Sequence, residues 1–371
     1  MIIKNAKVFS EDGVFEEKTI MMDGEYFSNT TTDTKEFDGT GYYIIPGLVD
    51  IHFHGCVGHD FCNGTEEAIQ AIADYELSCG VTTIVPASMT LSEDTLTTVF
   101  KAAAKHKNGK GAELVGINME GPFVSTAKKG AQNGAFIHKP DAEMFHRLNA
   151  ASGHMIKHVA LAPEEPGAME FIEQVKNDTV ISIAHTTADY DTAKKAIDAG
   201  ANHVTHLYNA MPPFTHRAPG VIGAAADHDN VFVELICDGI HIHPATVRTT
   251  FKIFGDDRIC LISDSMEATG MPDGEYALGG QKVIKTGNLA TLVDGTIAGS
   301  ATNLMDCLRT VITQMHIPME SAIKCATANP AKSIGIYDKY GSISIGKYAN
   351  CVALDSNLNI KAIFLKGKQV Y

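Results

Sequence analysis

The most informative part of the chain is the segment Ile44-Ile45-Pro46-Gly47-Leu48-Val49-Asp50-Ile51-His52-Phe53-His54. It is apolar almost throughout and ends in two histidines that stand one residue apart. Side chains on a β-strand alternate between its two faces, so we expect His52 and His54 to point the same way, close enough to share a cation. Taken alone, a His-x-His motif more often marks two hydrogen-bonded polar residues at a strand end. Other features of the chain favour the metal site.

Apolar, β-branched runs recur along the chain, and most of them are followed by a segment with helical periodicity or composition. Apolar strands that alternate with helices predict an α/β fold with a parallel sheet covered on its outside. Eight such units predict a TIM-like (β/α)₈ barrel. A doubly wound open sheet is the alternative, but no Gly-x-Gly-x-x-Gly motif follows the first strand. The runs are 48–54, 81–86, 114–120, 157–162, 180–185, 203–207, 231–237 and 259–264, and the helical segments are 66–78, 92–106, 168–176, 188–199 and 244–254.

Both ends of the chain have a different pattern. Residues 1–45 contain short alternating strands interrupted by Asp12-Gly13, Asp23-Gly24 and Asp38-Gly39, which are typical of hairpin turns. Residues 341–371 resume this pattern. We therefore predict a small β-sandwich domain formed by 1–45 and 341–371, with the barrel domain at 46–340 inserted between them. The glycine-rich segment 272–300 predicts a hairpin near the barrel mouth.

Composition limits the classes of partner. The 371 residues suit a barrel of about 250 residues with a smaller domain, and the net charge of −14 argues against a nucleic acid or an anionic membrane as the main ligand. No apolar run reaches the length of a membrane span, and the first residues lack a signal-peptide pattern, so we expect a cytoplasmic protein. The eight cysteines are scattered, which favours reduced thiols. The spacing of Cys56, His59 and Cys62 fits no common structural zinc site.

Histidines and carboxylates stand at the ends of the apolar runs. In a TIM barrel, functional groups gather at the carboxyl ends of the strands, so these side chains are expected to meet. Three imidazoles, or two with a carboxylate, suit zinc or a similar first-row metal. The set is large enough for two ions, and Glu120 could bridge a pair about 3.5–4 Å apart. The residues are His52, His54, Glu120, His185, His206, Asp238 and Asp264.

Two further residue types need an interpretation. Asp264 ends the eighth run, where it could simply cap the next helix. Beside a metal-bound water it could instead accept a proton and later donate it to a leaving group. A second His-x-His motif, His241 and His243, lies in the loop after the seventh run. We interpret His241 as a substrate contact and leave His243 unassigned.

Together, several motifs make the chain resemble the N-acetylglucosamine-6-phosphate deacetylases of the amidohydrolase superfamily, over essentially its whole length. The first motif marks only the superfamily, whereas the Glu-Gly-Pro and Thr-His-Leu-Tyr-Asn-Ala-Met segments are far more specific. The motifs are 46–55, Glu120-Gly121-Pro122-Phe123, Lys128-Lys129-Gly130-Ala131, Ala184-His185-Thr186, Thr205-His206-Leu207-Tyr208-Asn209-Ala210-Met211, Asp238-Gly239-Ile240-His241 and Ser263-Asp264.

The resemblance implies that Glu120, His185 and His206 hold the catalytic metal and that Asp264 is the general acid and base. The presence of His52 and His54 resembles the members that can bind two metals. The resemblance also implies that the sugar phosphate is bound by the backbone at 209–210 and by Arg217. In a homodimer, this Arg217 can come from the neighbouring subunit. A guanidinium group suits phosphate oxygens because its N–H donors match them in pairs. The expected substrate contacts are Ala131, Gln132, Asn209, Ala210, Arg217, Asp238, His241, Ile297, Ala298 and Gly299. Gln132 stands where some members have a histidine, which bears on sugar preference.

The implied reaction is metal-dependent hydrolysis of the acetamide of N-acetyl-D-glucosamine 6-phosphate, giving D-glucosamine 6-phosphate and acetate. A metal-bound hydroxide would be the nucleophile and Asp264 the base and then the acid. One or two divalent ions are expected per chain, and the ligands suit zinc, iron and manganese equally. The alternatives are the same reaction on N-acetylgalactosamine 6-phosphate, a cyclic-amide hydrolase of the same superfamily, and a non-catalytic sugar-phosphate-binding scaffold. Glu120 in place of a bridging carbamylated lysine argues against the second, and the intact ligand set argues against the third.

Overall fold

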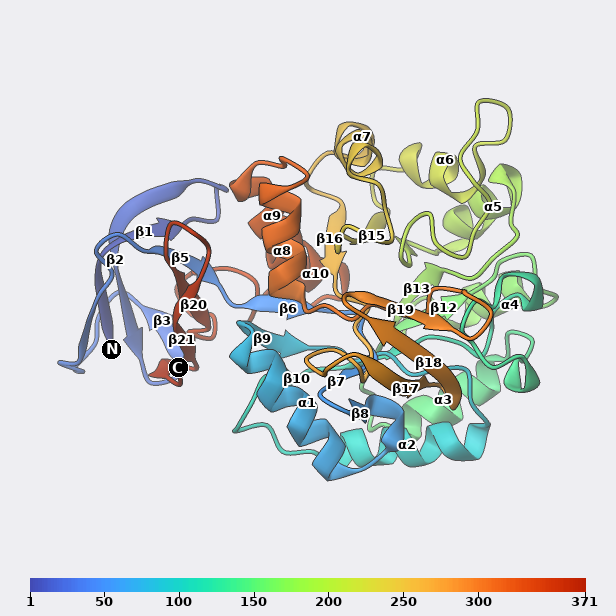
Figure 1. The fold of residues 1–371 in the computed structure, drawn as a ribbon, viewed down its shortest axis with the longest axis horizontal. Coiled ribbons are helices and arrows are strands. Elements are labelled where there is room, and N and C mark those ends of the chain that lie inside the picture. Colours follow the sequence, from blue (N-terminus) through green and yellow to red (C-terminus); the bar gives the residue numbers. More distant parts are fainter.

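The apolar runs form a closed ring of parallel strands at the centre of the molecule (Figure 1). The computed structural model describes all residues, 1–371. A parallel bridge between Ala87 and Asn118 joins the second strand to the third. The backbone N–H of Asp264 donates to the carbonyl of His52 (2.9 Å) and so joins the last strand to the first. The ring confirms the predicted barrel. In order, its strands are β6 (Leu48–Asp50), β9 (Val81–Ile84), β10 (Glu113–Leu114) with β11 (Ile117–Met119), β12 (Ile156–Leu161), β13 (Val180–Ile183), β14 (His203–Val204), β15 (Phe232–Ile236) and β16 (Ile259–Ile262).

One helix follows each strand and covers the outside of the barrel (Figure 1). Most begin at a residue whose side chain accepts a backbone N–H, such as Thr65, Ser92 or Asp189. The helices are α1 (Glu66–Ser78), α2 (Glu93–Lys105), α3 (Ala142–Ala151), α4 (Ala168–Val175), α5 (Tyr190–Ala199), α6 (Gly220–Ala226), α7 (Pro244–Phe254) and α8 (Leu304–Thr313). The additional helices α9 (Met319–Ala326) and α10 (Ala328–Ser333) pack on β6 and β16.

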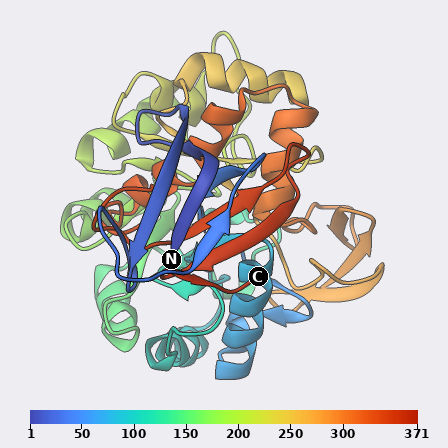
Figure 2. The same ribbon diagram turned by 90° about the vertical axis from the view of Figure 1, so that its left-hand side faces the viewer.

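The two chain ends form one hydrogen-bonded sheet beside the barrel, where strands from both termini lie next to one another (Figure 2). Its order is β22-β21-β20-β5-β1-β2-β3, with β4 on β1, and β5 pairs antiparallel with β20. It has an apolar core of its own, which includes Ile3, Ile44 and Phe364. The sandwich form expected for this region stays a prediction. The strands are β1 (Ile2–Phe9), β2 (Phe15–Asp23), β3 (Tyr26–Ser28), β4 (Glu36–Asp38), β5 (Tyr43–Pro46), β20 (Cys351–Leu354), β21 (Ile360–Leu365) and β22 (Lys368–Gln369).

The segment between β16 and α8 forms three antiparallel strands where the sequence predicts a hairpin. These are β17 (Gly274–Leu278), β18 (Gln281–Thr286) and β19 (Leu289–Leu292). Leu278 and Val283 share an apolar cluster with Met89 and Met266. The Gln281 side chain donates a hydrogen bond to the carbonyl of Ala131. These contacts hold the small sheet against the loops at the carboxyl end of the barrel.

The cysteines and the helices bear on two further expectations. All eight cysteines are free, and those of the Cys56, His59 and Cys62 trio do not belong to a metal-type cluster. No helix combines the length and the apolar character needed to cross a bilayer. The short remaining elements are β7 (Gly55–Cys56), β8 (His59–Asp60) and the 3₁₀ turns Phe61–Asn63, Thr126–Lys128 and Gly134–Phe136.

Candidate active site

The expected functional residues lie just beyond the ends of their strands, where the sequence predicts that they end the strands themselves. β6 ends at Asp50, two residues before His52, because there the chain turns to bond with the end of β16. His185, His206 and Asp264 have φ of 43°, 28° and 49°, in the left-handed region that non-glycine residues seldom adopt. Such backbone conformations persist where the surrounding structure enforces them, and they are common at active sites.

Glu120 lies at the centre of the site. Its Oε1 is 3.0 Å from Nε2 of His185 and 3.1 Å from Nε2 of His206, and those two nitrogens are 3.1 Å apart. The Nε2 of His54 is 3.3 Å from Glu120 Oε2, and the Nε2 of His52 is 3.6 Å from Oε1. Every one of these residues is at most 6% exposed. The structure therefore brings the other four expected metal ligands, all histidines, around the carboxylate of Glu120.

The hydrogen bonds on the other ring nitrogens show that this group fits a metal ion. Nδ1 of His185 is 2.9 Å from the carbonyl of Lys128, and Nδ1 of His54 is 3.3 Å from the carbonyl of Ala87. A carbonyl only accepts, so each Nδ1 carries the hydrogen and each Nε2 presents a lone pair. Lone pairs that face carboxylate oxygens repel one another unless a cation lies between them. The residues form two overlapping groups, one of His52, His54 and Glu120 and one of Glu120, His185 and His206.

Asp264 faces the same group. Its Oδ1 is 3.3 Å from Nε2 of His54 and 3.8 Å from Nε2 of His52. Burial raises the pKa of Asp264, but the contact with His54 and the positive charge of protonated imidazoles outweigh it and lower the pKa below its usual value; a metal ion held by the neutral rings would supply the same positive charge. The carboxylate is therefore ionised and able to accept a proton. This placement agrees with the base proposed from the sequence and not with a helix cap, because α8 is capped by Asn303.

A cavity of about 400 Å³ opens above these residues. It is lined by His54, Glu120, His185, His206 and Asp264 together with most of the expected substrate contacts, namely Ala131, Gln132, Asn209, Ala210, His241, Ile297 and Gly299. Lys128, Met89 and Leu278 also line it, and none of them has a role predicted from the sequence. Lys128 begins the Lys128-Lys129-Gly130-Ala131 motif, which is the one local signal for its presence here. Leu278 arrives from β17, and no local pattern could place it there.

Three expected contacts lie outside the lining. Asp238 is behind His241, with its Oδ2 2.7 Å from His241 Nδ1, so it orients that ring. Burial lowers the pKa of His241, but the bond and charge of Asp238 raise it above its usual value. Ala298 is fully buried and donates its N–H to the carbonyl of Ala290. Arg217 is exposed and borders a separate hollow.

Gln132 has a different environment from the one expected. Its Nε2 donates to Glu120 Oε2 (2.7 Å), and its Oε1 accepts the backbone N–H of Thr90 (2.7 Å). Both ends of the amide are thus engaged within the chain, and one of them supports a metal ligand. The unassigned His243 accepts the N–H of Ala245 and begins α7, away from the site.

Comparisons with known proteins agree with this geometry. The amidohydrolase family matches residues 43–370. The N-acetylglucosamine-6-phosphate deacetylase of Bacillus subtilis is 35% identical, over 99% of this chain and 96% of the relative. The N-acetylgalactosamine-6-phosphate deacetylase of Escherichia coli O157:H7 is 30% identical, over 99% and 98%. A variant of the N-acetyl-D-glucosamine-6-phosphate deacetylase from Mycobacterium smegmatis, in complex with N-acetyl-D-glucosamine-6-phosphate, superposes with a TM-score of 0.92 at 29% identity, covering 100% of this chain and 99% of the other. This chain therefore belongs to the amidohydrolase family.

Proposed function

We propose that the chain hydrolyses the acetamide of N-acetyl-D-glucosamine 6-phosphate to D-glucosamine 6-phosphate and acetate. The observation that carries the proposal is the ionised Asp264 beside convergent histidine and glutamate ligands at the base of a cavity of about 400 Å³. The names of the relatives supply the substrate class, and the intact ligand set argues for catalysis.

The metal would be held by Glu120, His185 and His206, and a second ion by His52 and His54 with Glu120 as the shared ligand. Zinc, iron and manganese all suit these donors. A bound ion of this kind polarises a carbonyl and lowers the pKa of a bound water molecule toward about 7.

Asp264 and His241 would carry the proton transfers and the charge. Asp264 accepts the proton of the attacking water and then donates it to the amide nitrogen, which is otherwise a very poor leaving group. Asp238 accepts from Nδ1 of His241 and raises the pKa of that ring, so the protonated ring would donate from Nε2 to the acetamide oxygen as negative charge develops there. Preorganised donors at this position typically contribute about 3–4 kcal/mol.

The phosphate would lie toward Asn209 and Ala210, both of which line the cavity. The same lining contains Lys128, whose positive charge suits a phosphate. Arg217 lies outside this chain's cavity, so we propose that it completes the site of a neighbouring subunit in a homodimer. We also propose a cytoplasmic enzyme of amino-sugar metabolism, with the small domain at 1–45 and 341–371 forming a β-sandwich.

N-acetylgalactosamine 6-phosphate is the second candidate substrate. A relative of that name is 30% identical to the chain. Gln132, at the position where the sequence suggests sugar preference, is bound to Glu120 and Thr90 and leaves little freedom to adapt to a different hydroxyl. One inverted hydroxyl changes one or two polar contacts, so the ratio of turnover on the two epimers separates the candidates.

Metal removal tests the proposed function. Chelation of the purified protein should abolish acetate release from N-acetyl-D-glucosamine 6-phosphate, and re-addition of zinc, manganese or ferrous iron should restore it, with metal content measured on each sample. Full activity in a sample shown to be free of metal would contradict the proposal.

A further inference from the structure

A fully buried carboxylate lies directly beneath the metal ligands. Glu234, on β15, is 0% exposed, and its Oε2 is 2.9 Å from Nδ1 of His52. The same oxygen accepts the backbone N–H of His206 at 3.0 Å. One carboxylate oxygen thus contacts a histidine from each of the two overlapping metal-ligand groups. Neither the reaction nor the expected substrate contacts account for a buried charge at this position.

We propose that Glu234 is a positioning residue that aligns His52 and His206 for metal binding. An ionised carboxylate only accepts, so the Nδ1 of His52 must carry the hydrogen and its Nε2 keeps the lone pair. That Nε2 is buried, makes no hydrogen bond and is 3.6 Å from Glu120 Oε1, so it is aimed at the metal ligands. Carboxylates placed behind ligating histidines in this way fix ring orientation and strengthen metal binding.

The contact of Glu234 with His206 holds a strained part of the backbone. His206 has φ of 28°. Its backbone N–H donates to the side-chain carboxylate of Glu234 and not to a backbone carbonyl of the neighbouring strand. The carbonyl of Glu234 also accepts the N–H of Leu207 at 2.9 Å, so both the side chain and the backbone of Glu234 hold this turn. The residue therefore connects β15 to the turn that presents His206.

The other face of Glu234 has a rival interpretation as a third metal site. Its Oε1 is 3.2 Å from Nε2 of His203 and 3.9 Å from Nδ1 of His158, and the three residues form a metal-type group. This group offers only three donors, whereas structural zinc sites have four. None of the three residues lines the cavity, so the group has no open side facing it. The positioning role is therefore favoured.

The test is a metal titration, which rests on the proposed metal site and not on the identity of the substrate. Glu234→Gln keeps a hydrogen-bond acceptor but removes the negative charge. Glu234→Met removes both the acceptor and the charge and keeps a side chain of similar size. We expect the second metal equivalent to bind about 10–100-fold more weakly in Glu234→Met, with Glu234→Gln intermediate. The matched control is Glu113→Gln, a buried carboxylate of β10 that pairs with Lys366 and Asn350. It should bind metal as the parent does.

A double-mutant cycle with His52→Ala separates positioning from general stabilisation. If Glu234 acts through His52, the double variant loses no more affinity for the second equivalent than His52→Ala alone. Additive losses, or parental affinity and stoichiometry in folded Glu234→Met, would overturn the proposal. So would a third ion per chain that is lost from the Glu234 variants while the other two remain. Because the readout is metal binding, a parent that binds metal normally but releases no acetate would refute the proposed function and leave this test intact.

Discussion

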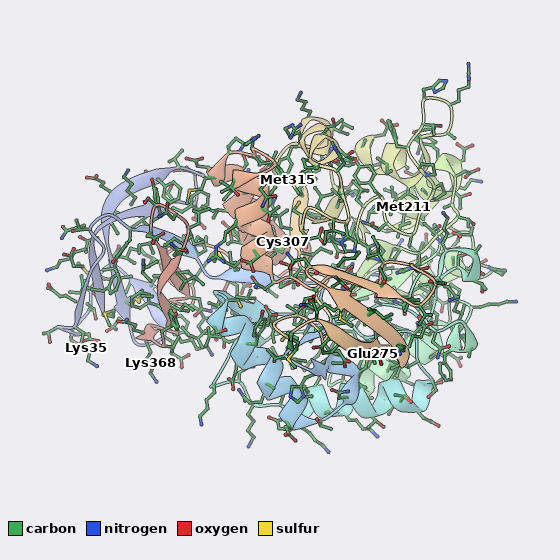
Figure 3. All side chains as sticks on the ribbon, viewed as in Figure 1. Lys35, Met211, Glu275, Cys307, Met315 and Lys368 are labelled. Carbon is green, nitrogen blue, oxygen red and sulfur yellow. The ribbon has the colours of Figure 1, made fainter.

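The carboxyl end of the barrel and the sheet formed by the termini bury opposite kinds of side chain. At the barrel end, His52, Glu120 and His206 are at most 4% exposed and lie against one another. The core of the terminal sheet is a cluster of apolar residues. Figure 3 shows Lys35 and Lys368 in that terminal lobe, on the opposite side of the view from Met211, which follows β14. Burying polar groups costs free energy unless they are paired, so the residues gathered at the barrel end lower the stability of the fold. The apolar core of the terminal sheet has no such cost.

Within the barrel end, the two groups of ligands also differ. His185 and His206 line the cavity, whereas His52 lies beneath it and is fully buried. His54 lines the cavity too, so each ligand group presents at least one histidine to a substrate, and Glu234 holds the buried His52 from behind. This arrangement predicts that substitutions at the barrel end change turnover far more than stability, and that substitutions at the terminal sheet do the reverse.

The largest effect is expected for Asp264→Asn. The amide cannot accept the proton of the attacking water, so turnover should fall by about 10²–10⁴-fold while metal content and sugar-phosphate binding are kept. Acetate release by metal-replete protein, with binding measured by calorimetry, checks this. Near-normal turnover in that sample would refute the role of Asp264.

The next largest effect is expected for Arg217→Ala. Loss of a charge-assisted bond to phosphate, worth about 1.5–3 kcal/mol, should raise KM for the phosphorylated substrate by about 10–100-fold and leave kcat nearly unchanged. Arg147→Ala is the control, since Arg147 is an exposed residue paired with Glu93.

Mixing subunits tests whether Arg217 acts on the partner's site. In a dimer of one Arg217→Ala and one Asp264→Asn subunit, one site would carry both defects and the other neither. At substrate concentrations well below KM, where both homodimeric variants are poorly active, random mixing should then restore about a quarter of the parental activity. If the mixture is no more active than the two homodimeric variants measured separately and summed, Arg217 does not act in the neighbour's site.

The smallest effect is expected at the terminal sheet. Burial raises the pKa of Glu11, but bonds from Ser344, Ser342 and Tyr337 and the charge of Lys347 lower it from 4.5 to about 2. A lowered folded-state pKa stabilises the fold above about 4.5, and this contribution is lost as the pH falls toward about 2. Glu11 is half exposed, so Glu11→Gln should cost at most about 1 kcal/mol at pH 7.

Urea unfolding at pH 7 and at several values below 4.5 measures this contribution. The difference between Glu11→Gln and the parent should shrink as the pH falls, with acetate release unchanged at pH 7. Glu17→Gln, an exposed carboxylate on β2, is the control. A difference that grows on acidification would contradict the assigned direction.

The sequence predicted the barrel and the gathering of histidines and carboxylates at its end because both depend on local patterns. Apolar runs ending in histidine or carboxylate mark the strands, and α1 and α7 match their predicted bounds. The strands end earlier than predicted because His185, His206 and Asp264 have left-handed backbone conformations that a strand cannot continue. The helix α6 is buried over all but its last residue, so it has no polar face and no helical periodicity that the sequence could reveal.

Glu234 shows what a sequence alone does not reveal. It stands inside the apolar run 231–237, and its partner His52 is 182 residues away. No local spacing connects the two, and only the closure of the barrel brings them together. The same reason hides Leu278 and the contact of Gln132 with Glu120, since each depends on which loops meet at the mouth.

The most direct test is acetate release from N-acetyl-D-glucosamine 6-phosphate, N-acetyl-D-galactosamine 6-phosphate and unphosphorylated N-acetyl-D-glucosamine, with metal quantified on the same sample. We predict fast turnover of the first, with one or two metal ions per chain, and at least about 10²-fold lower kcat/KM without the phosphate. No acetate from any of the three, with metal fully bound, would contradict the deacetylase function.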